Sequence, residues 1–352
     1  MPHWSPLDLV NLGGSPYWKS NPNARGVTMI GRVKALASLL LTAGLLAAAC
    51  GSGGATAPTS ADGVTAITVG TSPTLSNAAL YYADGEGMFK RNKLEVTLSP
   101  LQSGAAAVPL LLNGQLAVAA SDPVAAIVSV SKNVPVTIVA PGNVSPTDPA
   151  MDSTALLVKA DGPVKSVRDL DGKTVAVNAL NSLSHISVKR AIDKNGGDSS
   201  KVKFVELPLP QMVDAVARGQ VDGAVENEPY TTQGLESGLR RLVSPLTEAL
   251  PGVPQLVYLS AKPYVQKNAA TIDRFAAALT EANRYLGANP ETARAIGRTS
   301  TQTPPEVLEK ILVPVYNDKP VDRRSLTTLM DLMVRYGVIS APIDLNSVIS
   351  EP

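Results

Sequence analysis

Short apolar runs alternate with segments of helical pattern over residues 66–121. The runs A-I-T-V-G, L-E-V-T-L and L-A-V-A-A begin at Ala66, Leu94 and Leu116, and their length and composition are typical of strands. The segments between them, 77–84 and 105–113, favour helices. Alternation of this kind predicts a βαβαβ unit, in which helices cover the faces of a parallel sheet.

The same alternation begins again near Thr154. Four further strand-like runs follow, A-L-L-V-K, T-V-A-V-N, K-F-V-E-L and V-D-G-A-V, and segments 184–195 and 211–218 between them favour helices. Two rounds of one pattern predict two lobes.

The ends of the two rounds resemble each other in sequence. L-L-N-G-Q-L-A-V-A-A-S-D-P ends at Pro123, and V-A-R-G-Q-V-D-G-A-V-E-N-E-P ends at Pro229. We expect Gly114 and Gly219 to end helices in the left-handed conformation, and each proline to stand in the first turn of the next helix. The lobes should therefore be alike and face each other.

These patterns predict an α/β fold with two doubly wound lobes, a two-strand hinge and a C-terminal helical extension. We expect lobe 1 to comprise residues 65–145 plus 254–352, and lobe 2 to comprise residues 150–250. The hinge would use the segments around 140–149 and 250–254, which are rich in Pro and Gly.

Residues beyond the second crossover predict one return strand, Q-L-V-Y-L-S from Gln255, and then helices packed on lobe 1. The helical segments are 271–289, 290–299, 304–313 and 323–336. In the first of these, apolar residues at a spacing of three and four predict a buried stripe, formed by Ala276, Leu279, Ala282 and Leu286.

The segment from Ser166 to Tyr230 is the most distinctive part of the chain. It reads S-V-R-D-L-D-G-K-T-V-A-V-N, a polar loop N-A-L-N-S-L-S-H, and later P-L-P-Q-M-V-D-A-V-A-R-G-Q-V-D-G-A-V-E-N-E-P-Y. This wording resembles the solute-binding proteins of ABC importers in the nitrate, sulfonate, taurine and thiamine-precursor group. The resemblance implies a periplasmic-binding-protein-like fold and an extracytoplasmic protein that delivers a small solute to an ABC permease and ATPase.

The amino-terminal region predicts export and a lipid anchor. From Met29 a short basic region precedes an apolar run and then Cys50, followed by G-S-G-G. We interpret residues 29–49 as a lipoprotein signal peptide, Cys50 as the lipidated residue on the extracytoplasmic face of the membrane, and 50–64 as a flexible tether. Residues 1–28 fit a start codon assigned too early, or disorder. A plain cleaved signal with a spare cysteine is the alternative.

Composition and charge exclude several classes of partner. The 352 residues are 44% hydrophobic and 17% charged, which fits a globular core, and 31 Lys plus Arg nearly balance 30 Asp plus Glu. With this balance, no basic surface that would bind nucleic acid is predicted. We expect the protein to be a monomer. The chain has one Cys and two His, too few for a metal site with no carboxylate cluster beside them, and we expect no cofactor.

Polar clusters follow four of the predicted strands, at 71–77, 121–122, 178–185 and 226–230. In open α/β sheets, ligands bind beyond the carboxyl ends of strands, close to helix N-termini. The candidate ligand-binding residues are Ser72, Asn77, Ser121, Asp122, Asn178, Asn181, Ser182, His185, Glu226 and Tyr230. The alternative for each is a helix cap.

Charges near these clusters bear on the ligand. The carboxylates of Asp122, Glu226 and Glu228 would oppose an anion, and the nearest cations, Lys189 and Arg190, lie one turn into a helix. The pattern favours a neutral or weakly cationic nitrogen heterocycle over sulfonate or nitrate. Its ring would stack on a tyrosine: Tyr81, Tyr82 or Tyr230.

Motifs of catalysis are missing from the sequence. It contains no G-x-x-x-x-G-K-[ST], no G-x-S-x-G and no H-E-x-x-H. After the predicted processing, His185 is the only histidine and the lipidated Cys50 is no nucleophile, so there is no credible triad. We therefore expect a non-enzyme. Two alternatives stay open: an exported ligand-sensing lipoprotein, and a same-fold enzyme of the pyrimidine-precursor or chorismate-dehydratase type.

Overall fold

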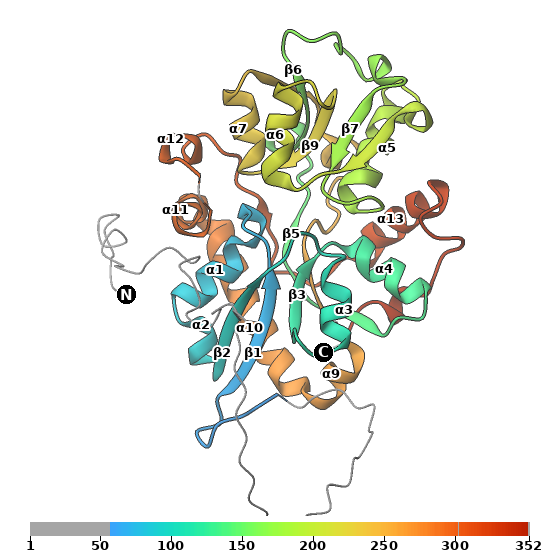
Figure 1. The fold of residues 1–352 in the computed structure, drawn as a ribbon. Helices are drawn as coiled ribbons and strands as arrows, with labels where there is room; N and C mark the ends of the chain where they lie inside the picture. Colours follow the sequence, from blue (N-terminus) through green and yellow to red (C-terminus); the bar gives the residue numbers. More distant parts are fainter. Residues whose placement is uncertain (1–56, 302, 351–352) are drawn as a thin grey trace, which may run out of the picture. The chain divides into compact units, whose positions relative to one another are not determined.

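The computed structural model describes residues 57–301 and 303–350, in which the strands form two five-stranded sheets and one two-stranded sheet (Figure 1). The predictions for residues 1–28, for the signal peptide 29–49 and for Cys50 concern residues outside the described part of the chain. The first large sheet contains β1 (Thr65–Thr71), β2 (Leu94–Pro100), β3 (Val118–Ser121), β4 (Val136–Pro141) and β11 (Val257–Ala261). The second contains β6 (Thr154–Lys159), β7 (Thr174–Val177), β8 (Lys203–Glu206), β9 (Gly223–Asn227) and β10 (Leu239–Val243).

Helices connect and cover these sheets. Around the first sheet they are α1 (Ala78–Gly85), α2 (Met88–Arg91), α3 (Ala107–Leu112), α4 (Pro123–Ser131), α9 (Lys262–Lys267), α10 (Ala269–Ala288), α11 (Pro290–Ser300), α12 (Pro305–Leu308) and α13 (Arg323–Arg335). Around the second they are α5 (Leu183–Lys194), α6 (Leu209–Ala217), α7 (Tyr230–Glu236) and α8 (Pro245–Ala249). Short 3-10 turns are η2 (Leu75–Asn77), η3 (Pro149–Met151), η4 (Val167–Leu170), η5 (Ser199–Lys201) and η6 (Leu345–Ser347).

The two large sheets have the same topology. Their strand orders are β2-β1-β3-β11-β4 and β8-β7-β9-β6-β10. In each sheet the first three strands pair in parallel, and the fourth strand is antiparallel to both of its neighbours. The parallel βαβαβ unit predicted over residues 66–121 is therefore confirmed in β1, β2 and β3. The antiparallel strands, β6 and β11, are those with which the chain enters each lobe from the opposite direction.

The repeated sequence pattern has most of the structure expected of it. Gly114 and Gly219 follow α3 and α6 with φ of 77° and 70°, the left-handed conformation in which glycine carries no steric cost. Pro123 is the first residue of α4, as predicted. Pro229 instead precedes α7 as its N-cap residue. The expectation for the glycines therefore holds in both lobes, and the expectation for the prolines holds in the first lobe.

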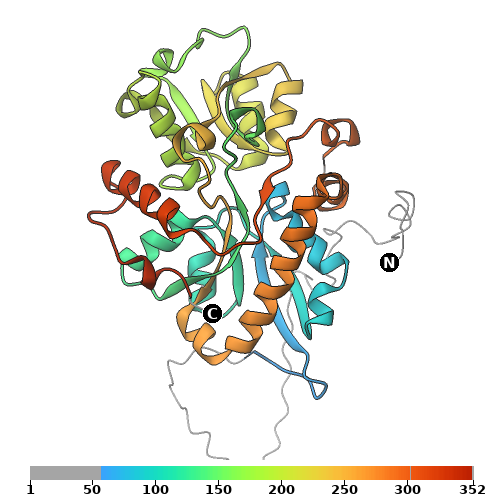
Figure 2. The same ribbon diagram turned by 180° about the vertical axis from the view of Figure 1, so that it is seen from behind.

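The core of the first lobe lies on both faces of its sheet. Helix α10 contacts α1 and β4, and α13 contacts α4 (Figure 2). The predicted stripe on α10 is confirmed, since Leu279, Ala282 and Leu286 are fully buried and Ala276 is partly buried. In the second lobe, α5 belongs to one apolar cluster and α6 to the other, on opposite faces of the sheet.

The connection between the sheets is polar and partly paired. The chain leaves β4, forms β5 (Asn143–Val144) and reaches β6, and it returns from α8 to β11 through a segment in which Pro254 bridges to Val144. The lobe boundaries expected from the sequence enclose these two sheets and stay a proposal.

The extension is less helical than its sequence indicates. The predicted helix over 304–313 ends at Leu308, and β12 (Val315–Tyr316) pairs with β5. Proline at 314 disfavours helical backbone at the residue before it. The extended segment also brings the backbone N–H of Leu312 within 3.1 Å of Glu228 Oε1, a contact that a continuous helix would not make.

Within the part of the chain that the structure describes, no helix combines the length and the apolar character needed to cross a membrane.

Candidate functional site

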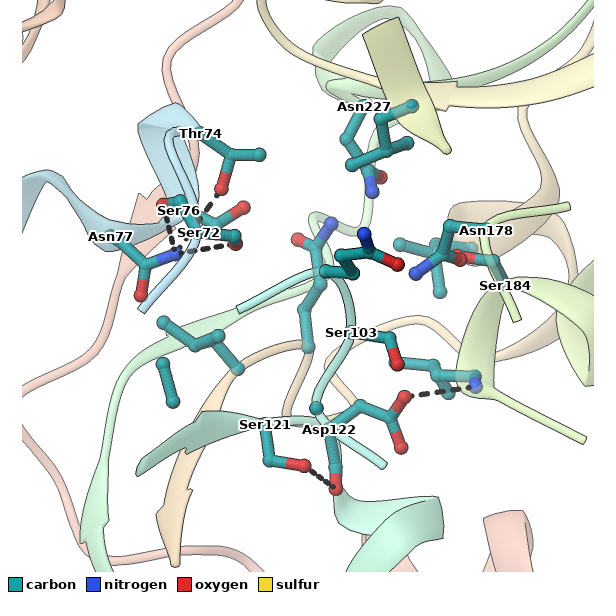
Figure 3. Close-up of a pocket in the computed structure, with 18 residues that line it drawn as sticks. Ser72, Thr74, Ser76, Asn77, Ser103, Ser121, Asp122, Asn178, Ser184 and Asn227 are labelled. Atoms are coloured by element: carbon teal, nitrogen blue, oxygen red, sulfur yellow. Dashed lines mark hydrogen bonds between the residues drawn. The ribbon is translucent and has the colours of Figure 1, made fainter. Parts of the chain in front are cut away.

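Polar residues from both lobes line one cleft (Figure 3). Its volume is about 670 Å³, counted with the space open to solvent. The lining residues are Ser72, Thr74, Ser76, Asn77, Gln102, Ser103, Gly104, Ala120, Ser121, Asp122, Asn178, Leu183, Ser184, Leu209, Asn227, Leu246, Gln255 and Leu256. Most of them follow the carboxyl ends of parallel strands, which is where open α/β folds bind ligands.

The loop after β1 is held in shape by one amide. Asn77 is fully buried, and its Nδ2 donates to the Ser72 backbone oxygen at 3.1 Å, to Ser72 Oγ at 3.2 Å and to Thr74 Oγ1 at 3.3 Å. These bonds fix the turn that presents Ser72 and Ser76 to the cleft. Asn77 thus shapes the lobe 1 wall.

The first lobe contacts the second through Asp122. One carboxylate oxygen accepts from Ala125 N at 3.0 Å and caps α4, and the other accepts from Leu183 N, in the first turn of α5, at 3.4 Å. Burial raises the pKa of Asp122, and the backbone hydrogen bonds oppose that rise. The carboxylate therefore stands at the N-terminus of α5, where an anionic ligand group would otherwise be favoured.

The second lobe contributes amides and a hydroxyl. Asn178 follows β7, Ser184 lies in the first turn of α5, and Asn227 ends β9. The buried Asn178 Oδ1 has no hydrogen-bond partner among the described residues. Figure 3 shows Asn178 and Asn227 on the same side of the opening, across from Ser72 and Thr74.

Two amides and a hydroxyl are linked where the chain crosses between lobes. Gln255 Nε2 donates to Thr154 Oγ1 at 3.0 Å, and Thr154 Oγ1 donates to Asn227 Oδ1 at 2.7 Å. Thr154 is fully buried, whereas Asn227 and Gln255 both line the cleft.

The charge of the cleft is low. No Lys, Arg or His is among its described lining residues, and Asp122 is the one carboxylate there. In the described part of the chain, no three His, Cys, Asp or Glu side chains gather closely enough to hold a metal ion. The arrangement can hydrogen-bond a small polar solute, and it offers no paired acid and base for chemistry.

The structure brings five of the ten predicted residues to the cleft: Ser72, Asn77, Ser121, Asp122 and Asn178. Asn181, Ser182, His185, Glu226 and Tyr230 do not line it. Ser182 caps α5 by accepting from His185 N at 3.3 Å, and it donates to Ala179 O. Contact of these five with a ligand stays a prediction, and for Ser182 the alternative of a helix cap is the one the geometry shows.

His185 faces the interior of lobe 2. Its Nδ1 accepts from Asn181 N at 2.9 Å, and its ring packs edge-on against Phe204 at 4.5 Å between centroids. Burial, helped by the nearby charge of Lys189, lowers the pKa of His185 to about 4. The imidazole is therefore neutral at physiological pH, and it orders the loop before α5.

Glu226 and Glu228 are not at the mouth of the cleft, which removes two of the three carboxylates expected to oppose anions. Both are buried, and neither Glu226 carboxyl oxygen has a hydrogen-bond partner within the described residues. Burial raises the pKa of Glu226 well above its usual value. The alternation of β9 explains the misplacement, because Glu226 and Asn227 point to opposite faces of the sheet and only Asn227 faces the cleft.

The three tyrosines proposed for stacking are elsewhere. Tyr81 is buried and donates to the Ser72 backbone oxygen at 3.1 Å, and Tyr82 stacks on Tyr285 with ring centroids 4.8 Å apart. Neither these nor Tyr230 line the cleft, and no aromatic side chain does among the described residues. A ring in this cleft would be held by its edge rather than by its face.

Sequence reasoning missed several lining residues, among them Gln102, Ser103, Ser184, Asn227 and Gln255. Asn227 stands inside the E-N-E-P-Y motif, and strand alternation could have selected it over Glu226. Gln255 lies in a crossover, where the sequence carries no signal of which way a side chain points.

Glu228 predicts a pH dependence of stability. Burial raises its pKa from 4.5 to about 7, against hydrogen bonds from Thr232 and Leu312 N. A carboxyl whose pKa is raised by folding adds stability that is fully present below pH 4.5 and is lost as the pH rises through about 7. Urea unfolding at about pH 5 and about pH 8 should show a smaller loss of stability with rising pH in Glu228→Gln than in the unsubstituted chain. Equal losses in the two proteins would contradict it.

Comparison with models of known protein families assigns the chain to a family. The model of proteins described as NMT1/THI5 like matches residues 75–293, which include all of the cleft lining except Ser72 and Thr74. The chain belongs to the NMT1/THI5-like family. This family assignment supports the solute-binding-protein group inferred from the segment between Ser166 and Tyr230.

Two curated relatives of this NMT1/THI5-like chain come from Escherichia coli (strain K12). The chain is 27% identical to the putative aliphatic sulfonates-binding protein over 214 residues, 58% of this chain and 65% of that protein. It is 30% identical to the taurine-binding periplasmic protein over 141 residues, 40% of this chain and 43% of that protein. The matched segments thus span less than two thirds of either relative. Both relatives are named for binding.

A solved structure confirms the fold class. The periplasmic nitrate-binding protein NrtA from Synechocystis PCC 6803 superposes with a TM-score of 0.67 at 15% identity, covering 80% of this chain and 84% of that chain. The two-lobed α/β architecture of periplasmic binding proteins predicted for this NMT1/THI5-like chain is therefore correct.

Proposed function

We propose that the protein is the substrate-binding component of an ABC importer, which captures a small solute between its lobes and delivers it to a permease and an ATPase. The observation that carries this proposal is the polar cleft lined by both lobes at the carboxyl ends of their strands. Relatives named for binding sulfonates and taurine support it.

Contacts across the cleft also support capture by closure. Asp122 of lobe 1 reaches α5, Leu75 N donates to the Glu228 backbone oxygen at 3.4 Å, and Tyr336 donates to Asp193 at 2.7 Å. These bonds join lobe 1 and its extension to lobe 2, so they would form and break as the lobes move.

Native mass spectrometry of the full chain, purified without refolding, tests the proposal. We expect a small molecule to remain bound or, if none does, a compound from a panel of heterocycles, sulfonates and nitrate to raise the melting temperature. A chain that carries no ligand and melts at the same temperature with every compound would overturn the proposal.

We further propose that the protein binds its ligand without changing it. Among the described residues that line the cleft, Asp122 is the one titratable carboxylate, and it is already engaged with two backbone N–H groups. A ligand incubated with the protein should be recovered chemically unchanged, and a new product would favour the same-fold enzymes instead.

For the ligand we retain a neutral nitrogen heterocycle over sulfonate or nitrate. The absence of Lys, Arg and His from the described cleft lining supports this preference, as does the Asp122 carboxylate at the start of α5. Stacking on tyrosine is no longer part of the proposal.

We propose that Cys50 carries the lipid that holds the protein on the extracytoplasmic face of the membrane. A Cys50→Ala substitution removes the thiol that would be acylated. The protein should then move from the membrane fraction to the soluble fraction, as measured by immunoblotting after ultracentrifugation. Retention of Cys50→Ala in the membrane fraction would contradict the lipid anchor at Cys50.

A further inference from the structure

The linked side chains of Gln255, Thr154 and Asn227, here called the Thr154 relay, hold two cleft amides in a fixed relation. Both amides bond to one atom, Thr154 Oγ1, at 3.0 Å and 2.7 Å. At its other end, Gln255 Oε1 accepts no hydrogen bond from a described residue, and Asn227 Nδ2 donates none to one. Both side chains line the cleft. Those ends are therefore available to a ligand.

The number of protons in the relay limits what the amides can present. A threonine hydroxyl has one proton, so it can donate to only one amide oxygen. For both amides to turn their NH₂ groups to the cleft, both oxygens would have to accept from Thr154, which needs two protons. In the structure Thr154 leaves the NH₂ of Asn227 and the oxygen of Gln255 unbonded. Reversing the relay exchanges the two roles, and in either direction one of the two amide oxygens is left to accept from a ligand.

We infer that the Thr154 relay is a specificity device that selects a ligand with a hydrogen-bond donor beside an acceptor, such as the edge of an amide or a lactam. This inference rests on the proposed function. Sulfonate and nitrate oxygens only accept hydrogen bonds, so one of them would face the oxygen of Gln255 with no donor between them. Gln255 is half-buried, and a ligand covering it would leave that oxygen without a donor and out of reach of water, which is costly. No cation lines the described cleft to offset this cost.

The substitution Thr154→Val tests the relay. Valine has nearly the shape of threonine but no hydroxyl, so both amides become free to turn. Uracil and cytosine serve as probes with an amide-type edge, and methanesulfonate and nitrate serve as acceptor-only probes, each titrated calorimetrically into the full chain. We expect uracil or cytosine to bind the unsubstituted chain and to bind Thr154→Val about tenfold more weakly. The binding of methanesulfonate and nitrate should not be weaker in Thr154→Val than in the unsubstituted chain.

Two further variants separate the relay from a general structural effect. Thr154→Ser keeps the hydroxyl and should restore the affinity. Thr137→Val removes a hydroxyl that is also buried and bonded, to the Val348 backbone oxygen at 3.1 Å, but that lies outside the cleft lining, and it should leave the affinity unchanged. Equal weakening of all four probes in Thr154→Val would show a structural role and overturn the inference.

The outcomes also separate this inference from the proposed function. Tighter binding of methanesulfonate or nitrate than of uracil and cytosine by the unsubstituted chain would overturn the relay and leave a binding protein. Binding of none of the four would also contradict the relay, and a different ligand found by mass spectrometry would still uphold solute binding. With no ligand by either method, both fail.

Discussion

Replacing Phe275 with alanine should lower the free energy of unfolding by about 3–5 kcal/mol. Phe275 is fully buried on α10, and its ring lies parallel to Phe89 at 5.4 Å between centroids and edge-on to Tyr258 at 5.7 Å. Truncation would leave a cavity among rigid neighbours and remove both aromatic contacts. Urea unfolding measures the loss.

A matched surface pair provides the control for this prediction. Tyr285 lies on the same helix, stacks on Tyr82 at 4.8 Å and is 43% exposed. Tyr285→Ala should cost roughly 1 kcal/mol, because solvent already contacts much of the ring and no closed cavity forms. If the two substitutions cost the same, the core around α10 is not as closely packed as the structure indicates.

Replacing Gly104 with alanine should weaken ligand binding by about tenfold or more. A Cβ atom built on Gly104 would stand 2.7 Å from the Cα of Ser121, which is backbone and cannot rotate away. The loop after β2 would have to move from the end of β3, and both loops line the cleft. Overpacking of this kind also costs about 1–3 kcal/mol of stability.

Titration with the ligand found by native mass spectrometry checks the effect of Gly104→Ala. Gly85→Ala is its control, because a Cβ atom at Gly85 meets nothing within 4 Å. This glycine lies at the end of α1 and outside the cleft lining, so the control should bind as the unsubstituted chain does. Undiminished binding by Gly104→Ala would mean that the loop after β2 is not a fixed wall.

Local patterns of the sequence predicted most of the strands and helices. The runs that begin at Ala66, Leu94 and Thr174 form β1, β2 and β7, because an apolar run of that length is stable only when it is buried in a sheet. The local pattern did not determine the direction of β6 and β11, because that direction depends on how the chain enters each lobe.

For the candidate site too, local patterns predicted some residues and long-range contacts decided the others. The sequence indicated Ser121, Asp122 and Asn178, because a polar residue directly after a buried strand must emerge at the strand end. It misplaced Glu226 and overlooked Asn227, since adjacent residues of a strand face opposite sides and the register of β9 against β6 sets which side is the cleft. Gln255 was unpredictable, because its partner Thr154 is 101 residues away in the chain.

The sequence by itself therefore determined the family, the two-lobed α/β fold and the loops that meet at the cleft. These depend on periodicity and on turn residues, which act over a few positions. Only the tertiary structure decided the charge of the cleft and the linkage of its amides. Burial and hydrogen bonding depend on atoms that the chain brings together from distant positions, so no local pattern encodes them.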